Sequence, residues 1–420
     1  MEYLFAMWDG GGTVGPELVL VRRLVARGHR VTALAAPTLR TQVEAAGATF
    51  LPWQRVPHRR MAADPDPFVD HDLRTPMQVA DRLLDRVLAG PAADYAAEVG
   101  AALDARPADA VLATFTLLGA LAAAESRGLP SVALMPNVYL LPARGLPPYG
   151  TGWFPLRGPL GRLRDSVMNA VFLRLWSPGT ATLNAARHEL GLPPLRHVFD
   201  QLTGATRVLV LTSRAFEFPA RMPANVRYVG PQLDDPAWAL PAELPPGDEP
   251  LVLVSMSSTF MDQAPVLRRA VAALDTLPVR TLVTTGPEID PAEVPGTERV
   301  RVVRSAPHST VLPHAAACVT HGGHGSVAKA LVAGVPQLVI PLGRDQPDSA
   351  ARVVAAGAGL RLGRKAPPGA IARAVRRLLD EPSFRIRAAE LGAVMRADEA
   401  SGTAIDELEA VALDRNGVTP

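Results

Sequence analysis

Short apolar runs rich in β-branched residues alternate along this chain with longer stretches whose apolar residues recur at helical spacing. This alternation predicts strand–helix–strand units that pair in parallel sheets. The first unit consists of a strand over residues 3–8, a glycine turn, a helix over 16–27 and a second strand over 30–35. Glu17 lies just inside that helix, where a negative charge suits the positive end of the helix dipole.

The same pattern places more strands along both halves of the chain. They are predicted at 49–52, 110–113, 131–135 and 208–211, and again at 251–255, 280–284, 300–303, 318–320 and 337–340. Between them, residues 231–250 are dense in proline and acidic residues and show no periodicity, which is typical of a linker. The sequence therefore predicts an α/β fold with two similar halves joined by a linker.

Two segments interrupt the alternation, at 53–76 and 136–176. The second is rich in aromatic residues, which argues against disorder: Tyr139, Tyr149, Trp153, Phe154 and Trp176. We interpret these insertions as the walls of an apolar pocket. For any single aromatic residue among them, ordinary packing of a long loop is an equally good interpretation.

Composition narrows the class of protein. The 420 residues carry 43 basic and 41 acidic side chains, and no basic stripe suggests binding to nucleic acid. A lone cysteine, Cys318, excludes an internal disulfide and suits the cytoplasm. The N-terminus reads as a buried strand rather than a signal peptide. The longest apolar stretch, at 110–124, is too short for a membrane span.

The chemistry concentrates in the segment 318–350, which reads as strand, glycine turn, helix, strand and loop. Gly322, Gly323 and Gly325 in the turn HGGHGS let the backbone turn sharply and approach a ligand, and the following helix points free N–H groups at it. His321 and Ser326 can donate hydrogen bonds to phosphate oxygens there. Three glycines and a serine also suit any strand-to-helix turn. The later pair Asp345 and Gln346, at the same sheet edge, favours a ligand site because an acid beside an amide can hold sugar hydroxyls.

The segment SAPHSTVLPHAAACVTHGGHGSVAKALVAGVPQLVIPLGRDQPDSA resembles the donor-binding signature of family 1 glycosyltransferases, above all the actinobacterial antibiotic enzymes, and enediyne glycosyltransferases in particular. LVLVRRLVARGHRVT, LGALAAAESRGLPSVAL and LVLVSMSSTF extend the resemblance over nearly the whole chain. It implies the GT-B architecture, in which two Rossmann-like, doubly wound domains face an interdomain cleft. The expected parts are an acceptor domain at 1–215, a linker at 216–250, a nucleotide-sugar domain at 251–381 and helices at 382–420 that cross back onto the first domain.

The resemblance also implies roles for individual residues. The diphosphate would be held by His321, Gly323, His324, Gly325, Ser326, Ser257 and Ser258. Asp345 and Gln346 would contact the sugar, and Ala306 and His308 would lie near the base. The acceptor pocket would contain Thr114, Met135, Tyr139, Trp153 and Phe154. Ser305, His308 and Ser349 stand where many members have Trp, Gln and Asn.

The acceptor side departs from the family. A histidine usually deprotonates the acceptor from a GHxxP turn, and an aspartate partners it; this chain has Thr13 and Thr114 at those positions. A threonine hydroxyl is too weakly basic for this task. Asp9 in the same turn, or His58 or His71, could replace the base. Alternatively, the acceptor is itself nucleophilic, as a phenol, hydroxylamine or amine is, or the protein binds ligands without catalysis. We favour the nucleophilic acceptor.

These features predict single-step, inverting transfer of a sugar from a nucleoside diphosphate to a lipophilic acceptor, and the resemblance implies that the nucleotide is TDP. The helix dipole would stabilise the departing diphosphate, with no metal and no other cofactor. A nucleotide-sugar epimerase of the same architecture and a catalytically silent binding partner are the rival functions. The sequence leaves a homodimer open.

Overall fold

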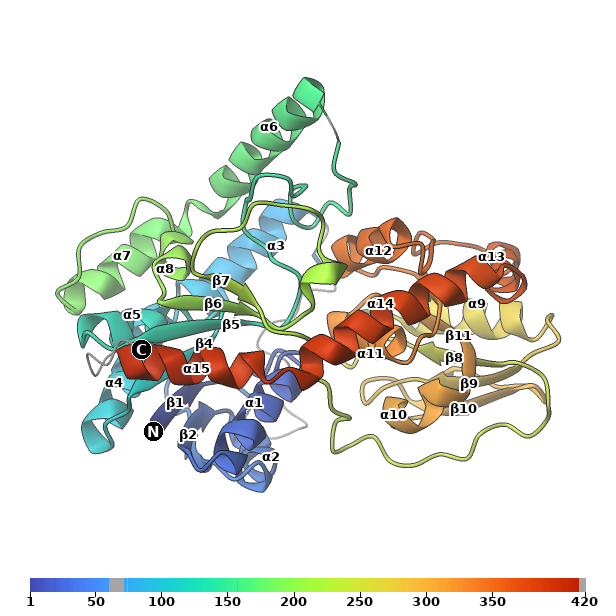
Figure 1. Cartoon of the computed structure of the whole chain (residues 1–420), viewed down its shortest axis with the longest axis horizontal. Coiled ribbons are helices and arrows are strands. Elements are labelled where there is room, and N and C mark those ends of the chain that lie inside the picture. Colours follow the sequence, from blue (N-terminus) through green and yellow to red (C-terminus); the bar gives the residue numbers. More distant parts are fainter. Residues whose placement is uncertain (60–71, 74, 157, 415–420) are drawn as a thin grey trace.

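A computed structural model describes residues 1–59, 72–73, 75–156 and 158–414. Its strands form two parallel sheets, each at the centre of one lobe, and the two lobes lie side by side (Figure 1). The expected α/β fold with two Rossmann-like sheets is confirmed. We call the lobe around the first sheet the N-terminal lobe and the other the C-terminal lobe.

The first sheet has the strand order β3-β2-β1-β4-β5-β6-β7. Its strands are β1 (Glu2–Ala6), β2 (Arg30–Ala35), β3 (Thr49–Pro52), β4 (Ala110–Thr114), β5 (Ser131–Met135), β6 (Arg207–Val210) and β7 (Val226–Tyr228). The order of winding reverses between β1 and β4, and at such a point a crevice opens beyond the carboxyl ends of the strands. Ligand contacts are therefore expected just after β1 and β4.

The second sheet repeats this order as β10-β9-β8-β11-β12-β13. Its strands are β8 (Leu251–Ser255), β9 (Arg280–Thr284), β10 (Val300–Val303), β11 (Ala315–Thr320), β12 (Gln337–Val339) and β13 (Gly359–Arg361). Its reversal lies between β8 and β11. The glycine turn that follows β11 is thus at the crevice of its own lobe.

Helices cover both faces of each sheet. In the N-terminal lobe they are α1 (Val14–Ala26), α2 (Arg40–Ala45), α3 (Pro76–Leu83), α4 (Ala92–Ala105), α5 (Leu118–Ser126), α6 (Gly158–Trp176), α7 (Gly179–Glu189) and α8 (Asp200–Thr203). From residue 251 onward they are α9 (Ala264–Leu274), α10 (His308–Val311), α11 (His324–Val332), α12 (Gln346–Ala355), α13 (Pro368–Asp380), α14 (Pro382–Ala400) and α15 (Thr403–Asp414). Short helical turns lie at Pro37–Leu39, Leu84–Leu88, Arg214–Phe216, Pro291–Glu293 and Leu312–His314.

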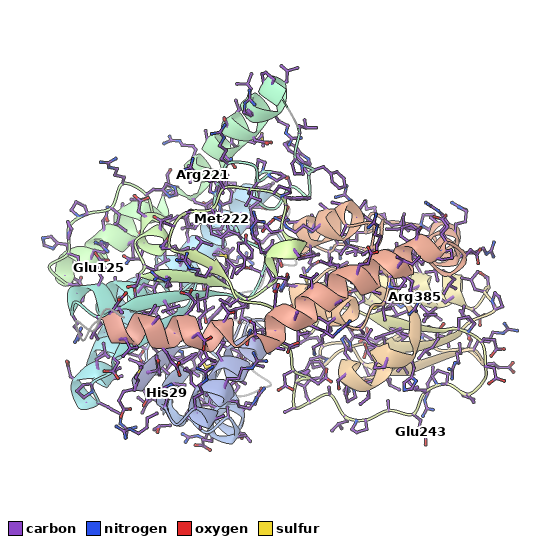
Figure 2. The ribbon with its side chains drawn as sticks, viewed as in Figure 1. His29, Glu125, Arg221, Met222, Glu243 and Arg385 are labelled. Carbon is purple, nitrogen blue, oxygen red and sulfur yellow. The ribbon has the colours of Figure 1, made fainter. Side chains whose placement is uncertain are left out.

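The last two helices cross from the C-terminal lobe to the N-terminal lobe, as expected (Figure 1). On α14, Arg385 donates to the carbonyls of Ala315 and Ala316 at 2.9 Å each. On α15, Leu408 is buried in the core of the N-terminal lobe, and the Glu409 carboxylate lies 2.8 Å from His29 Nε2. Figure 2 labels Arg385 and His29 near the two ends of this strap.

Two details differ from the sequence prediction. The segment 136–176 is irregular only in its first part, because its second part is the long helix α6. The strands β7 and β13, of three residues each, were not predicted. The insertion at 53–76 falls partly outside the described residues. The predicted domain limits stay a prediction, although the strands of the two sheets do separate at 229–250.

Among the described residues, no helix combines the length and the apolar character needed to cross a membrane.

Candidate active site

A cleft of about 1080 Å³ lies between the lobes. It is lined by the loops that follow β1, β4 and β5 in the N-terminal lobe and by those that follow β8, β11 and β12 in the C-terminal lobe. Of the residues predicted from the sequence, it brings together Asp9, Thr13, Ser257, Ser258, Ala306, His308, His321, Gly323, His324, Gly325, Ser326, Asp345 and Gln346. Its volume is at the upper end of the range for small-molecule sites, so it has room for more than one substrate.

The glycine turn after β11 forms one end of the cleft. Gly322 has φ +93, and a Cβ there would come within 2.8 Å of Val339 Cγ1. A Cβ on Gly323 would lie 2.4 Å from His321 Nε2, so the glycine makes room for the histidine ring. The helix α11 then begins at His324 without a side-chain cap. Its first N–H groups therefore remain available to an anion in the cleft.

Two histidines of this turn are buried yet line the cleft, His321 and His324, each 7% exposed. Burial lowers the pKa of both imidazoles to about 4, so both rings are neutral at pH 7. His321 Nδ1 has no hydrogen-bond partner among the described residues, whereas the ring of His324 lies close to the backbone of Leu211. A buried polar atom without a partner is costly, and a ligand in the cleft could satisfy His321 Nδ1.

The predicted sugar-binding pair lies at the start of α12. Burial, together with the nearby charge of Asp348, raises the pKa of Asp345 to about 6. The Gln346 side-chain oxygen accepts from the backbone N–H groups of Leu342 (2.7 Å) and Gly343 (3.1 Å). Gln346 therefore shapes the loop that carries Asp345, and Asp345 is the freer of the two to meet a sugar.

The residues predicted near the base, Ala306 and His308, line the cleft next to the linker. His308 Nε2 lies 3.0 Å from Ser255 Oγ, and its backbone N–H donates to Asp235 of the linker at 3.0 Å. Burial lowers the pKa of the His308 ring to about 4. Asp235 also accepts from Lys329 at 2.8 Å. These contacts hold the linker against the C-terminal lobe at the cleft.

The linker brings an aromatic residue that the sequence pattern did not reveal. Trp238 lines the cleft and is 43% exposed. Ser305 Oγ donates to the Trp238 carbonyl at 3.2 Å and accepts from the backbone N–H of Leu240 at 3.1 Å. The family resemblance implies a tryptophan at the position of Ser305, and Trp238 comes to this region from the linker. The sequence alone gave no indication of this placement.

The walls of the cleft in the N-terminal lobe, where an acceptor pocket was predicted, differ from the prediction. Thr114, Met135, Tyr139, Trp153 and Phe154 do not line it. Its walls are instead formed by Phe115, Thr116, Pro136, Asn137, Leu140, Tyr149, Phe172, Leu175, Trp176 and Phe199. Of the aromatic residues in the 136–176 insertion that the sequence placed in the pocket, Tyr149 and Trp176 line the cleft. Phe172 of α6 and Phe199, which directly precedes α8, also line the cleft and were not predicted to do so.

Each of the five corrections has a physical reason. Thr114 and Met135 end their strands with side chains that are fully buried within the lobe, and the cleft is met by the next residues along. Tyr139, 3% exposed, packs into the core of the N-terminal lobe. Trp153 and Phe154 lie outside the cleft, where the guanidinium groups of Arg164 and Arg361 stack over their rings at 4.9 and 5.9 Å.

The two threonines at the expected positions of the base pair hold the main chain of Trp8. Thr13 Oγ1 donates to the Trp8 carbonyl at 2.9 Å, and Thr114 Oγ1 accepts from the Trp8 N–H at 3.0 Å. Thr114 in turn donates to Glu17 Oε1 at 2.7 Å. Glu17 is fully buried, and burial raises the pKa of its carboxyl to about 8. Glu17 is thus part of a buried network and not a simple surface charge at a helix end.

The alternative bases are in different places. Asp9 lines the cleft and accepts from Thr38 Oγ1 at 3.2 Å. His58 does not line the main cleft; its Nδ1 lies 2.7 Å from the Val56 carbonyl. His71 lies outside the described residues. Asp9 is therefore the carboxylate among these candidates that the structure brings to the cleft.

Comparisons with known proteins decide the family. Residues 267–411 match the family model described as Erythromycin biosynthesis protein CIII-like, C-terminal domain. The chain is 32% identical to 4'-demethylrebeccamycin synthase of Lentzea aerocolonigenes, over 97% of this chain and 98% of that protein. It is 30% identical to O-mycaminosyltylonolide 6-deoxyallosyltransferase of Streptomyces fradiae, over 92% of each chain. The chain belongs to the family 1 glycosyltransferases of actinobacterial natural-product type.

Solved structures agree on the fold of this glycosyltransferase. The kitacinnamycin glycosyltransferase superposes with a TM-score of 0.76 at 25% identity, covering 98% of both chains. CalG4, the calicheamicin glycosyltransferase, superposes with a TM-score of 0.73 at 24% identity, covering 98% of this chain and 97% of that one. The architecture is GT-B, and the enzyme is a glycosyltransferase that uses nucleotide sugars.

Proposed function

We propose that this glycosyltransferase moves a deoxysugar from TDP to a lipophilic natural-product acceptor in a single inverting step. The observation that carries the proposal is the composition of the cleft. One end offers free helix N–H groups and the unpartnered His321 Nδ1, and the other end is walled by apolar and aromatic side chains. Such a cleft suits an anionic donor opposite an apolar acceptor.

In this mechanism the α11 terminus stabilises the negative charge that grows on the diphosphate as the bond to the sugar breaks. The N–H groups of His324, Gly325 and Ser326 are fixed before the reaction, so they need no reorganisation during it. His321 is neutral and donates one hydrogen bond without adding charge. Asp345 holds the sugar so that its anomeric carbon faces the N-terminal lobe.

The acceptor supplies its own nucleophilicity, as a phenol, a hydroxylamine or an amine does. Thr13 supports this view, because its hydroxyl is engaged with the Trp8 carbonyl and a threonine cannot act as a base at neutral pH. Asp9 is the alternative base. An enediyne with an N–O linked sugar is the acceptor that we favour. The relatives named above are named after different natural products, so their names do not indicate which acceptor this enzyme uses.

The nucleotide is bound between the linker and the C-terminal lobe. We propose that Trp238 stacks on the thymine base, with Ala306 and His308 beside it and Ser257 and Ser258 near the phosphates. The functional parts then follow the predicted limits, with acceptor binding in 1–215, the linker in 216–250, donor binding in 251–381 and the strap in 382–420.

The reverse reaction tests the proposal. Incubation of the protein with a glycosylated natural product and free TDP should return TDP-sugar and the aglycone, detected by mass spectrometry. An epimerase would instead change the configuration of an added TDP-sugar without using the aglycone, and a silent binding partner would change neither. Replacing TDP by UDP in the same assay shows which base is accepted.

We expect the transfer to need no metal, because the charge on the diphosphate is met by the helix terminus and by hydrogen-bond donors. Turnover should be unchanged after treatment with EDTA. A loss of turnover that a divalent cation restores would contradict this expectation.

We also propose that the enzyme is a homodimer joined through α6. Four large apolar residues at helical spacing are exposed on this helix: Leu160 (82%), Leu163 (62%), Val167 (53%) and Val171 (53%). Figure 1 shows that α6 projects from the body of the molecule. Apolar stripes of this kind commonly mark interfaces, and a second copy presents the same stripe.

A further inference from the structure

Asp348 on α12 binds a loop of the opposite lobe. Its Oδ2 accepts from the backbone N–H of Gly150 at 2.6 Å, and its Oδ1 accepts from that of Gly152 at 2.9 Å. Arg361 on β13 donates to the Gly152 carbonyl at 2.7 Å. Asp348 itself is only 5% exposed. We call Asp348, Gly150, Gly152 and Arg361 the loop clamp.

At the loop clamp, the loop and the helix α12 are in close contact. Gly152 has φ +62, and a Cβ there would come within 2.8 Å of Pro347. One turn further along the same side of α12, Arg352 forms a buried ion pair at 2.5 Å with Glu217, which follows β6. The helix that begins directly after Asp345 is therefore tied to the N-terminal side of the cleft at two points.

Tyr149 is held next to the loop clamp and lines the cleft. Its ring packs edge-on against Phe172 of the acceptor wall, with the ring centroids 6.4 Å apart. Burial, with further contributions from the charges of Asp345 and Asp348, raises the pKa of its phenol well above the usual range. The phenol thus stays protonated as a hydrogen-bond donor and lies where the acceptor wall meets the predicted sugar site.

We propose that the loop clamp presents Tyr149 to the donor sugar, so that Tyr149 helps to determine which sugar the enzyme accepts. The phenol donates to a sugar oxygen beside Asp345, which selects hexoses that keep an oxygen at that position. Asp348 acts as a positioning residue because it holds the backbone on the C-terminal side of Tyr149. This inference rests on the proposed function, since it requires a nucleotide sugar in the cleft.

The test compares a nucleotide with the same nucleotide carrying a sugar. Dissociation constants for TDP and for TDP-glucose are measured by calorimetry with the wild-type chain and with Tyr149→Phe and Asp348→Asn. Tyr149→Phe removes only the hydroxyl. Asp348→Asn keeps the shape but can accept from only one of the two loop N–H groups through its carbonyl oxygen.

We expect both variants to bind TDP as the wild type does and to bind TDP-glucose about fivefold to tenfold more weakly, the loss of roughly one hydrogen bond. Tyr139→Phe is the matched control, because Tyr139 is in the same loop but is buried in the core and does not line the cleft. It should leave both dissociation constants unchanged.

Two outcomes would overturn the inference. If affinities for TDP and TDP-glucose fall together in the variants, the loop clamp only maintains the structure of the cleft. If neither affinity changes in Tyr149→Phe, the phenol does not touch the sugar. A wild-type chain that binds neither compound would overturn the proposed function as well, and this measurement is made before any variant is compared.

Discussion

Thr13 and Thr114 illustrate how single residues determine the chemistry of this site. Both hydroxyls contact the main chain of Trp8, and Thr114 also donates to the buried Glu17. The two positions for which the resemblance implies a base and its partner therefore carry structural hydrogen bonds here. We therefore expect Thr13 and Thr114 to affect the rate of transfer only by stabilising the turn after β1.

Replacing Thr13 tests this interpretation. Thr13→Ala removes one hydrogen bond at 2.9 Å, and we expect the kcat of transfer to fall by less than about tenfold, because a single hydrogen bond contributes about 1 kcal/mol. Loss of a general base would cost about two to four orders of magnitude. Thr13→Ser, which keeps the hydroxyl, is the control. A collapse of several orders in Thr13→Ala with TDP binding intact would mean that Thr13 takes part in catalysis.

Trp238 provides a second test at the same scale. If its ring stacks on the base, Trp238→Ala should weaken TDP binding by about tenfold or more, since stacking of a base on an aromatic ring contributes about 1–3 kcal/mol. Trp238→Phe should keep most of the affinity. Trp153→Ala is the control, because Trp153 is similarly exposed, at 38%, but lies outside the cleft. Equal TDP affinity in Trp238→Ala and the wild type would exclude stacking.

Individual side chains were also where the sequence was least informative. The strand ends at Thr114 and Met135 were predicted within one residue, yet the cleft is lined by Phe115, Thr116, Pro136 and Asn137. Side chains alternate between the two faces of a strand, so an error of one residue changes which side chain faces the ligand. Trp238 could not be found either, because a linker without periodicity gives no information about where it runs.

At the scale of elements, the strand β11, the glycine turn and α11 were predictable because their sequence has only one good conformation. The strand is a continuous apolar run, the glycines permit the sharp turn, and the helix follows at once. By contrast, α6 was taken for irregular structure. Its two sides are both largely apolar, one toward the cleft and one toward solvent, so it lacks the usual amphipathic pattern.

The turn before α11 can be tested with one methyl group. In Gly323→Ala the new Cβ would lie 2.4 Å from His321 Nε2, so the ring must leave its place over the turn. We expect TDP affinity to fall by about tenfold or more, since the loss combines a hydrogen bond to phosphate with a displaced backbone. Gly363→Ala, where nothing lies within 4 Å, is the control and should bind normally. Normal binding by Gly323→Ala would mean that His321 does not hold the diphosphate.

At the scale of the whole molecule, the two sheets and their order were within reach of the sequence, because alternating apolar strands and helices nearly always form right-handed parallel units. The relative placement of the lobes was not. This placement depends on side-chain contacts between distant segments, such as those of Asp348 with Gly150 and Gly152. No local sequence pattern predicts such contacts.

The assembly of two chains belongs to this scale as well. We expect light scattering to give the mass of a dimer, and the double variant Leu160→Glu, Leu163→Glu to give the mass of one chain, because charges on the α6 stripe would have to be buried in the interface. The substituted side chains are exposed, so the variant should fold as the wild type does. A wild-type mass of a single chain would contradict the proposed homodimer.

The strap made by α14 and α15 has a consequence for how the chain is made. Ile405, Leu408 and Val411 complete the core on one face of the first sheet, whose strands all precede α15 by more than 170 residues along the chain. During synthesis the N-terminal lobe therefore keeps an apolar face uncovered until α15 has followed it. A product that terminates before α15 exposes that apolar face. Such a fragment should aggregate and should not fold into an isolated, stable N-terminal lobe.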